Sequence, residues 1–243
     1  MSDIVAAAEK ATEPPRARYV SHMFGRIAHR YDLMNTLMTL GRDRRWRRLT
    51  AALAVVKRDG LALDLGTGSG ELALDMASLG CRVIAMDFCQ PMMELARKKV
   101  ASRTGASVSF AAGDALNLPF PGNTFDCITA GFALRNFADL GLALREMHRV
   151  LKPLGRVAAL ELTPPRSELA RLLHGLYSHR YVPLLGRLVA GDGAAYTYLP
   201  ESVDRFPDAE GLCHELLQAG FGQVSYRTLG LGMVAIHVAE KRP

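Results

Sequence analysis

The sequence predicts an α/β fold built on an open, doubly wound sheet that is mostly parallel, with an antiparallel pair at its C-terminal edge. Short, continuous apolar runs alternate with segments of helical periodicity through the middle of the chain, which is typical of parallel strands buried on both faces. Short connections and right-handed crossovers between such units give a doubly wound sheet. Two late apolar runs, separated by Gly230-Leu231-Gly232, indicate the antiparallel pair.

The expected elements follow one another regularly. Strands are expected at 61–65, 83–86, 108–111, 125–130, 156–161, 224–229 and 234–239. Helices are expected at 71–79, 91–100, 140–151 and 207–219. Gly80 after the first of these helices, Pro91 at the start of the second and Lys152-Pro153 after the third are typical helix boundaries.

Two segments depart from this alternation, and both are expected to belong to a single domain spanning 18–243, after a flexible N-terminal arm at 1–17. Residues 18–57 are expected to be helical, because apolar residues recur at three- and four-residue steps. These are Phe24, Ile27, Tyr31, Met34, Leu37 and Met38. Residues 166–205 are expected to form a helical lid inserted into the domain.

The chain is basic, with a formal net charge of +6 and a pI of about 9.3. Five arginines surround Trp46, namely Arg42, Arg44, Arg45, Arg47 and Arg48. One interpretation is a solvated helix face, and the other is contact of Arg42–Arg48 with lipid head groups or another acidic surface. Nucleic acid is not an expected partner, since no helix-turn-helix, zinc-finger or RNA-binding pattern occurs.

Composition also bounds the location and the chemistry. The four cysteines have no metal or redox spacing, and the seven histidines form no ligand-spaced cluster, so we predict no metal site. The N-terminus lacks the apolar run of a secretory signal, and no apolar run is long enough to span a membrane. We expect a cytoplasmic protein, at most peripheral on the inner face of the membrane, and a homodimer is among the states that the sequence allows.

The strongest motif is glycine-rich and lies between the strand 61–65 and the helix 71–79. It comprises Gly66, Thr67, Gly68, Ser69 and Gly70. Glycines let a backbone turn tightly and approach a ligand closely, and open α/β sheets bind ligands at the carboxyl ends of their strands. The spacing matches neither the dinucleotide pattern nor the P-loop. Taken alone, this glycine-rich pattern is equally typical of a tight turn that binds no ligand.

The next strand ends in Asp87, followed by Phe88. An acidic side chain here can accept hydrogen bonds from both hydroxyls of a ribose. A helix N-cap role before Pro91 is compatible with this. The third strand is followed by Asp114 and Ala115, where Asp114 either accepts from an adenine amino group or only forms a turn.

The fourth element is Asp126, followed by Ile128-Thr129-Ala130-Gly131-Phe132. It is expected to end the fourth strand beneath the loop where substrate should meet cofactor. The glycine loop, Asp87, Asp114 and this strand occur in order at successive strand ends. Together they resemble the Rossmann-like fold of class I methyltransferases. This resemblance implies S-adenosylmethionine as the cofactor.

Three further segments give a closer resemblance. They are Tyr31-Asp32-Leu33-Met34-Asn35 with Gly41 and Arg45-Trp46; Leu118-Pro119-Phe120-Pro121, Asn123-Thr124-Phe125-Asp126 and Phe132-Ala133-Leu134-Arg135-Asn136-Phe137; and Val189-Ala190-Gly191-Asp192, Tyr196, Tyr198-Leu199 and Glu201-Ser202. From about residue 19 to the C-terminus the chain resembles the C-methyltransferases of ubiquinone and menaquinone biosynthesis. The implied cofactor contacts are Ser69, Asp87, Asp114, Ala115 and Gly131.

The resemblance implies methyl transfer to a ring carbon of a prenylated (hydro)quinone, from demethylmenaquinol to menaquinol or at the equivalent ubiquinone precursor. It points to Arg135 beside the ionising phenol, and to Tyr31 and Asn35 as lining groups. Arg135 can instead be a structural ion pair, and the other two can be packing or capping residues. Departures from the family pattern, such as Leu154 in place of a Pro-Gly-Gly turn, leave the quinone open.

Residues 168–189 could cover the prenyl tail or form plain core. Three other functions stay open. The acceptor could be another small molecule, such as a polyketide, a sterol or an aromatic hydroxyl. The reaction could be a late C-methylation of mature menaquinone. The chain could also bind S-adenosylmethionine without turnover, as a partner in a biosynthetic complex.

Overall fold

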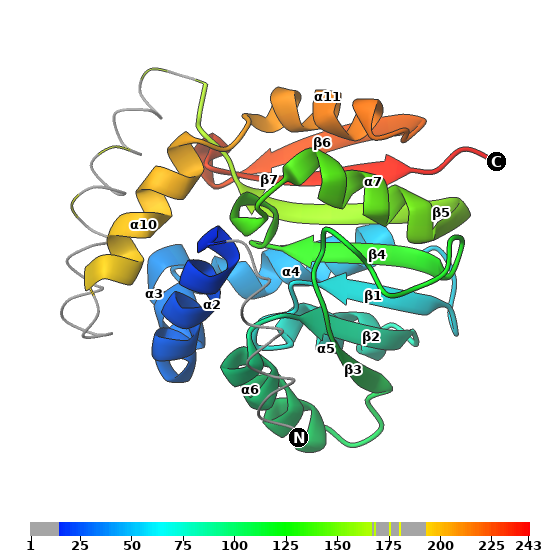
Figure 1. Cartoon of the computed structure of the whole chain (residues 1–243), viewed down its shortest axis with the longest axis horizontal. Helices are drawn as coiled ribbons and strands as arrows, with labels where there is room; N and C mark the ends of the chain where they lie inside the picture. The colour runs from blue at the N-terminus through cyan, green and yellow to red at the C-terminus, as the bar shows by residue number, and fades with distance from the viewer. Residues whose placement is uncertain (1–14, 167, 169–174, 176–179, 181–192) are drawn as a thin grey trace.

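The computed structural model describes residues 15–166, 168, 175, 180 and 193–243, and it contains a seven-stranded sheet with helices packed on it (Figure 1). The strands run in the order β3-β2-β1-β4-β5-β7-β6. In chain order they are β1 (Leu61–Leu65), β2 (Arg82–Asp87), β3 (Val108–Ala112), β4 (Phe125–Gly131), β5 (Leu151–Leu162), β6 (Gln223–Leu229) and β7 (Val234–Glu240). Each contains a predicted strand.

The sheet is parallel from β3 to β5 and antiparallel beyond it. β7 pairs antiparallel with both β5 and β6, so it lies between them. β1 has β2 on one side and β4 on the other, so the winding of the chain reverses beside β1. Ligands bind at the carboxyl ends of strands at such a reversal. The predicted fold class is confirmed.

Some helices cover the two faces of the sheet, and others lie at the ends of its strands (Figure 1). They are α2 (Pro15–Ile27), η1 (Ala28–Arg30), α3 (Tyr31–Thr39), α4 (Arg42–Ala54), α5 (Glu71–Ser78), α6 (Gln90–Ala101), η2 (Leu134–Asn136), α7 (Leu140–Val150), α10 (Gly193–Asp204), α11 (Ala209–Gln218) and η5 (Gly230–Gly232). Successive strand residues point to opposite faces. Ala62 packs in one core with α4 and α5, and Leu63 packs in another with α7 and α11.

β5 begins earlier than predicted. The helix expected to reach 151 ends at Val150, and Leu151 already pairs with Phe125 at the start of β4. The pairing then shifts register between Phe125 and Cys127. Lys152-Pro153 therefore stops the helix as expected, yet lies inside the strand, because proline is tolerated at such irregularities.

The N-terminal helices α2 and α3 lie across the carboxyl ends of the parallel strands, with α10 beside them (Figure 1). Met23, Ile27 and Met34 are buried between them, and Tyr198 and Leu199 of α10 pack against this cluster. α2 begins at Pro15, so the predicted arm at 1–17 overlaps the helix. Proline suits the first turn of a helix, since its missing N–H would have no partner there.

The predicted lid at 166–205 is described only in part. α10 is helical, as expected. The apolar stripe proposed to cover a tail lies outside the described residues; it comprises Leu169, Leu172, Leu173, Leu176, Tyr177, Tyr181, Leu184 and Leu185. Within the described part of the chain, no helix is long and apolar enough to cross a membrane.

Candidate functional site

The glycine loop joins β1 to α5 at the carboxyl end of the sheet. Gly66, Gly68 and Gly70 have positive φ angles of 66°, 54° and 81°, which L side chains rarely adopt. A Cβ atom on Gly66 would lie 2.6 Å from the Cβ of Ala133, and one on Gly70 would lie 3.0 Å from the Cβ of Ala96. The loop therefore needs glycine both for its conformation and for close packing.

Asp87, the last residue of β2, holds the loop from the neighbouring strand end. Its Oδ2 accepts a hydrogen bond from the N–H of Gly68 at 2.8 Å, and its Oδ1 accepts one from the N–H of Cys89 at 2.9 Å. Burial raises the pKa of Asp87, and the backbone N–H groups of Cys89, Gly68 and Phe88 oppose this. Each carboxylate oxygen can accept more than one bond, so Asp87 can still bind a ligand.

A pocket lies beside the loop, and we call it the Asp87 pocket. Six predicted site residues line it, namely Tyr31, Gly66, Gly68, Asp87, Phe88 and Gly131. Phe24, Met92 and Phe137 give it an apolar wall. The pocket also includes Asn136, whose Oδ1 accepts a hydrogen bond from the Tyr198 hydroxyl at 3.2 Å.

A second pocket is lined by the same loop, and we call it the Arg47 pocket. It shares Tyr31, Gly66, Gly68 and Gly131 with the Asp87 pocket. The predicted Thr67 and Ser69 line it. So do three charged residues that the sequence motifs did not assign to the site, Arg47, Asp64 and Glu71.

Asp64 is a carboxylate enclosed at the end of β1. It is 1% exposed. Its Oδ2 accepts from the Thr67 hydroxyl at 2.6 Å and its Oδ1 from the Thr129 hydroxyl at 2.7 Å. Burial raises the pKa of Asp64 to about 6, against the lowering effect of these two bonds. The sequence motifs did not assign Asp64 to the site, although an acidic residue inside the apolar run Leu61–Leu65, directly before the loop, is a signal that could have identified it.

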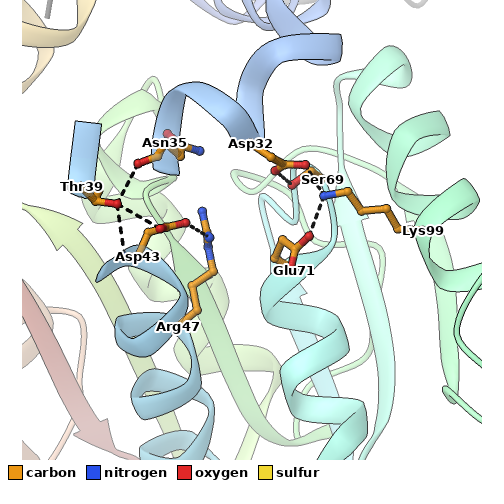
Figure 2. Close-up of polar contacts among 8 residues, drawn as sticks. All are labelled: Asp32, Asn35, Thr39, Asp43, Arg47, Ser69, Glu71 and Lys99. Atoms are coloured by element: carbon orange, nitrogen blue, oxygen red, sulfur yellow. Dashed lines mark hydrogen bonds and ion pairs between the residues drawn. The ribbon is translucent and has the colours of Figure 1, made fainter. Parts of the chain in front are cut away.

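Helix α3 is tied to the glycine loop by a polar network (Figure 2). The Ser69 hydroxyl donates to Asp32 Oδ1 at 2.6 Å. The Lys99 ammonium of α6 donates to Asp32 Oδ2 and, at 2.7 Å, to Glu71 Oε1. We call these four residues the α3 clamp. Sequence patterns missed Asp32, Glu71 and Lys99 because the network joins residues far apart in the chain.

A second polar ladder runs from α3 to α4 (Figure 2). The Thr39 hydroxyl lies 2.7 Å from the carbonyl oxygen of Asn35 and 3.0 Å from Asp43 Oδ1. Asp43 Oδ2 accepts from Arg47 Nη1 at 2.5 Å. The side-chain Nδ2 of Asn35 is buried and has no hydrogen-bond partner among the described residues. The predicted lining residue Asn35 lines neither pocket but lies one helical turn from Tyr31.

Arg135 forms a buried ion pair. Its Nη1 donates to Glu161 Oε1 at 2.6 Å and to the carbonyl oxygen of Phe132 at 2.7 Å. The two side chains are 6% and 1% exposed. Arg135 therefore lies behind the segment whose Phe132, Ala133 and Asn136 line the Asp87 pocket, and its own side chain is not part of the pocket wall.

Asp114 and Ala115 lie at the next strand end. β2 pairs with β3 up to Asp87 opposite Ala112, and the Gly113 N–H donates to the Asp87 carbonyl at 3.3 Å. Asp114 is exposed and its Oδ1 accepts from the Leu116 N–H at 3.0 Å, whereas Ala115 is buried. Asp114 thus forms a turn beside Asp87, and neither it nor Ala115 lines the two pockets.

Asp126 does not lie beneath the loop, contrary to the prediction. It is the second residue of β4, so it lies at the opposite end of that strand from Gly131. Its Oδ2 accepts from the Leu61 N–H at 2.8 Å, and Lys57 and Lys152 pair with the carboxylate at 3.0 Å. The strand β4 is seven residues long, so Asp126 and Gly131 lie near its two different ends. The sequence prediction placed both residues at the carboxyl end.

The arginine cluster divides into two groups. Arg42, Arg44, Arg45 and Arg48 are exposed, but Arg47 is 7% exposed and its guanidinium lies 5.8 Å from the centre of the Phe132 ring. The prediction of a membrane contact is therefore wrong for Arg47, because the face of α4 that carries Asp43, Arg47 and Thr50 is buried. Among the described residues, no group of three or more His, Cys, Asp or Glu is placed to hold a metal ion.

Comparison with known proteins agrees with this geometry. A family model described as the ubiE/COQ5 methyltransferase family matches residues 12–241. A demethylmenaquinone methyltransferase of Roseiflexus castenholzii is 46% identical over 233 residues, which is 94% of this chain and 97% of the relative. A ubiquinone/menaquinone biosynthesis C-methyltransferase UbiE of Pseudomonas paraeruginosa is 38% identical over 233 residues, 94% of this chain and 91% of the relative.

Solved structures share the fold. A SAM-dependent methyltransferase from Thermotoga maritima superposes with a TM-score of 0.63 at 20% identity, over 91% of this chain and 99% of that one. At this identity the likeness supports the architecture alone.

Proposed function

Because the chain belongs to the ubiE/COQ5 methyltransferase family, we propose that it transfers a methyl group from S-adenosylmethionine to a ring carbon of a prenylated quinol. We propose demethylmenaquinol as the acceptor. The relative at 46% identity is named demethylmenaquinone methyltransferase, whereas the one named for both quinones is 38% identical. The observation that carries the proposal is the glycine loop, which is held by Asp87 and lines two pockets.

The residues around the loop fit S-adenosylmethionine. The positive φ angles and the close contact of Gly66 with Ala133 exclude side chains, so bare backbone faces both pockets. Asp87 would accept hydrogen bonds from the ribose hydroxyls, with Phe88 beside it. Asp114 and Ala115, at the adjacent strand end, would contact the adenine.

When bound, S-adenosylmethionine supplies an electrophilic methyl group carried by its sulfonium sulfur. The protein has to exclude water from that group and hold the acceptor carbon in line with it, and such positioning supplies several kcal/mol of the barrier. Phe24, Met92 and Phe137 provide the apolar wall of the Asp87 pocket for this task.

The acceptor would lie against α3 and the segment after β4. Tyr31 lines both pockets and is fixed by an edge-on contact with Phe24, with ring centres 5.8 Å apart. Asn35 lines neither pocket, so its buried Nδ2 would donate to the acceptor only where the acceptor extends past Tyr31 along α3. Arg135 would favour the ionised phenol as a buried cation behind the wall, and Asn136, its neighbour in the chain, would contact the ring.

The role of Arg135 has a direct test. Replacement by alanine should lower turnover while calorimetry still detects cofactor binding. If Arg135→Ala left both turnover and cofactor binding unchanged, the assignment would be wrong.

Two experiments test the function itself. The purified chain, supplied with S-adenosylmethionine and demethylmenaquinol, should form a product heavier by one methyl group, and Asp87→Ala should abolish this by weakening cofactor binding. In a deletion strain, mass spectrometry should find a quinone pool lighter by one methyl group. An unchanged pool would contradict the proposal.

The alternatives predict other results. A methyltransferase for another small acceptor would use the same cofactor residues but leave demethylmenaquinol unchanged. A late C-methyltransferase would act on mature menaquinone instead. A binding protein without turnover would give a calorimetric signal with S-adenosylmethionine and no methylated product from any quinol.

We also propose that the exposed arginines of α4, Arg42, Arg44, Arg45 and Arg48, contact the anionic membrane surface where a tailed quinone is stored. Basic residues near such a surface attract it by about 1 kcal/mol each. The chain should float with anionic liposomes at low salt, and replacing all four by serine should abolish this. No binding by the unmodified chain at low salt would contradict the proposal.

A further inference from the structure

A buried arginine lines the cleft beside the glycine loop, although none of the sequence motifs assigns it a role. The Arg47 side chain is 8% exposed and belongs to the wall that also includes Thr67, Ser69 and Asp64. Burying a guanidinium is costly unless its charge and its N–H groups are matched. Its surroundings therefore indicate which ligand the pocket accepts.

The guanidinium is held in one orientation with donors to spare. Among the described residues, its hydrogen-bonded acceptor is Asp43, reached through Nη1. Asp43 is itself 2% exposed and is contacted by Thr39 (Figure 2). A guanidinium has five N–H donors in a rigid fork, so those not used by Asp43 remain for a ligand in the pocket. This fork matches the two oxygens of a carboxylate.

The position along the cleft selects which part of a ligand meets Arg47. Asp87 assigns the ribose to the Asp87 pocket. The Arg47 pocket shares Gly66 and Gly68 with it, so the amino-acid end of a cofactor whose ribose is held by Asp87 would lie there. That end is a zwitterion, and the pocket offers both signs of charge, with Asp64 and Glu71 for an ammonium and Arg47 for a carboxylate.

We infer that Arg47 binds the carboxylate of the amino-acid end of S-adenosylmethionine, and that the Asp43–Thr39 ladder holds it in place for this. The inference rests on the proposed function. It assigns a cofactor-binding role to one member of the arginine cluster and separates it from its exposed neighbours. Arg47 thus acts on the cofactor, and through it on the position of the methyl group.

The test compares two ligands by calorimetry, S-adenosylmethionine and its decarboxylated form, which lacks only the carboxylate. The unmodified chain should prefer S-adenosylmethionine. Arg47→Met should weaken S-adenosylmethionine by about 10- to 100-fold, the range expected for a lost charged hydrogen bond, and leave the decarboxylated form nearly unchanged. The matched control is Arg103→Met, an exposed arginine just after α6 to which no binding role is assigned, and this variant should alter neither affinity.

Arg47→Lys is the second variant, in case the methionine variant does not fold. It keeps the charge but loses the fork, and should still weaken S-adenosylmethionine selectively. Unchanged affinity for S-adenosylmethionine in either folded variant would overturn the inference. Equal weakening of both ligands would also overturn it, since Arg47 would then only support the pocket. If the unmodified chain bound neither ligand, the proposed function itself would fail.

Discussion

Asp64 shows how a single residue links burial to the chemistry of the site. Its carboxylate is enclosed, accepts two threonine hydroxyls and has a pKa raised to about 6 by burial. A carboxylate held in this way is destabilised while no cation is near it. An ammonium bound in the Arg47 pocket would offset that cost. Removing this destabilisation of the unliganded protein would therefore contribute to the free energy of binding.

The raised pKa predicts a pH effect on stability. Between the ordinary value of 3.8 and about 6, the folded chain binds more protons at Asp64 than the unfolded chain. The stabilising contribution is therefore complete below that window and is lost as the pH rises through it, because each pH unit between the two pKa values removes about 1.4 kcal/mol. Asp64→Asn should lose this dependence, so the variant should gain up to about 3 kcal/mol relative to the unmodified chain between pH 4 and 8.

Urea unfolding of both proteins across this pH range measures the difference, and the other carboxylates cancel in the comparison. Parallel pH profiles would show that Asp64 is not enclosed as described.

The pair of Arg135 and Glu161 predicts a different stability effect. Removing Arg135 alone leaves a carboxylate 1% exposed without its cation, which costs about 3–5 kcal/mol in buried pairs. Arg135→Met should lower the free energy of unfolding by that amount. The double variant Arg135→Met with Glu161→Gln should recover most of it, because no charge is then left buried.

Denaturant titration of the unmodified chain, the two single variants and the double variant measures the coupling free energy between Arg135 and Glu161. If the double variant recovers stability but not turnover, the arginine acts on the reaction as well as on the fold. Additive losses would contradict the buried ion pair.

At the scale of elements, β5 contains an unfavourable turn. Leu154 has a φ of 62° and is 67% exposed. A left-handed backbone conformation costs an L residue roughly 1–2 kcal/mol. Replacing the residue by glycine removes this cost but also increases the entropy of the unfolded chain, which offsets part of the stabilisation. Leu154→Gly should therefore stabilise the chain by about 0.5–1 kcal/mol. Thermal unfolding measures this, with Leu154→Ala as the control that keeps the strain and should gain little.

Helix α3 connects the elements around the site, since it carries Tyr31, Asn35 and the Asp32 of the α3 clamp. Lys99 joins it to α5 and α6 through Asp32 and Glu71. Lys99→Met should loosen α3 from the loop, by about 0.5–1 kcal/mol because the Lys99 side chain is 22% exposed. Hydrogen exchange of residues 31–39 should become several-fold faster, while exchange in α7 stays unchanged. Equal exchange in α3 would show that its apolar contacts suffice.

For the whole molecule, the parallel strands bring one end of each βα unit to a common edge, and α2, α3 and α10 lie across it (Figure 1). Ligand binding at these strand ends should stabilise the whole fold, because a ligand that binds only the folded chain raises the free energy of unfolding as its concentration increases. S-adenosylhomocysteine at about one hundred times its dissociation constant should add about 2.7 kcal/mol. Asp87→Ala should lose this gain in a thermal unfolding series.

The sequence alone determined the strands, their mostly parallel arrangement and the glycine loop with Asp87, because each depends on local periodicity or on glycine conformation. It also carried the motifs that place the chain in its family. Residue roles that depend on distant contacts were decided only by the tertiary structure. Arg47 turns inward while its neighbours face solvent, Arg135 pairs with Glu161, and Asp126 lies near the amino end of its strand, away from the glycine loop.

The α3 clamp makes the same point. Ser69 meets Asp32 across 37 residues of chain and Lys99 meets Asp32 across 67. No periodicity within a segment encodes such pairs, since they exist only once α3 lies across the carboxyl ends of the sheet. Local patterns determined the scaffold, and the packing of the N-terminal helices against it decided which charged side chains face the two pockets beside the glycine loop.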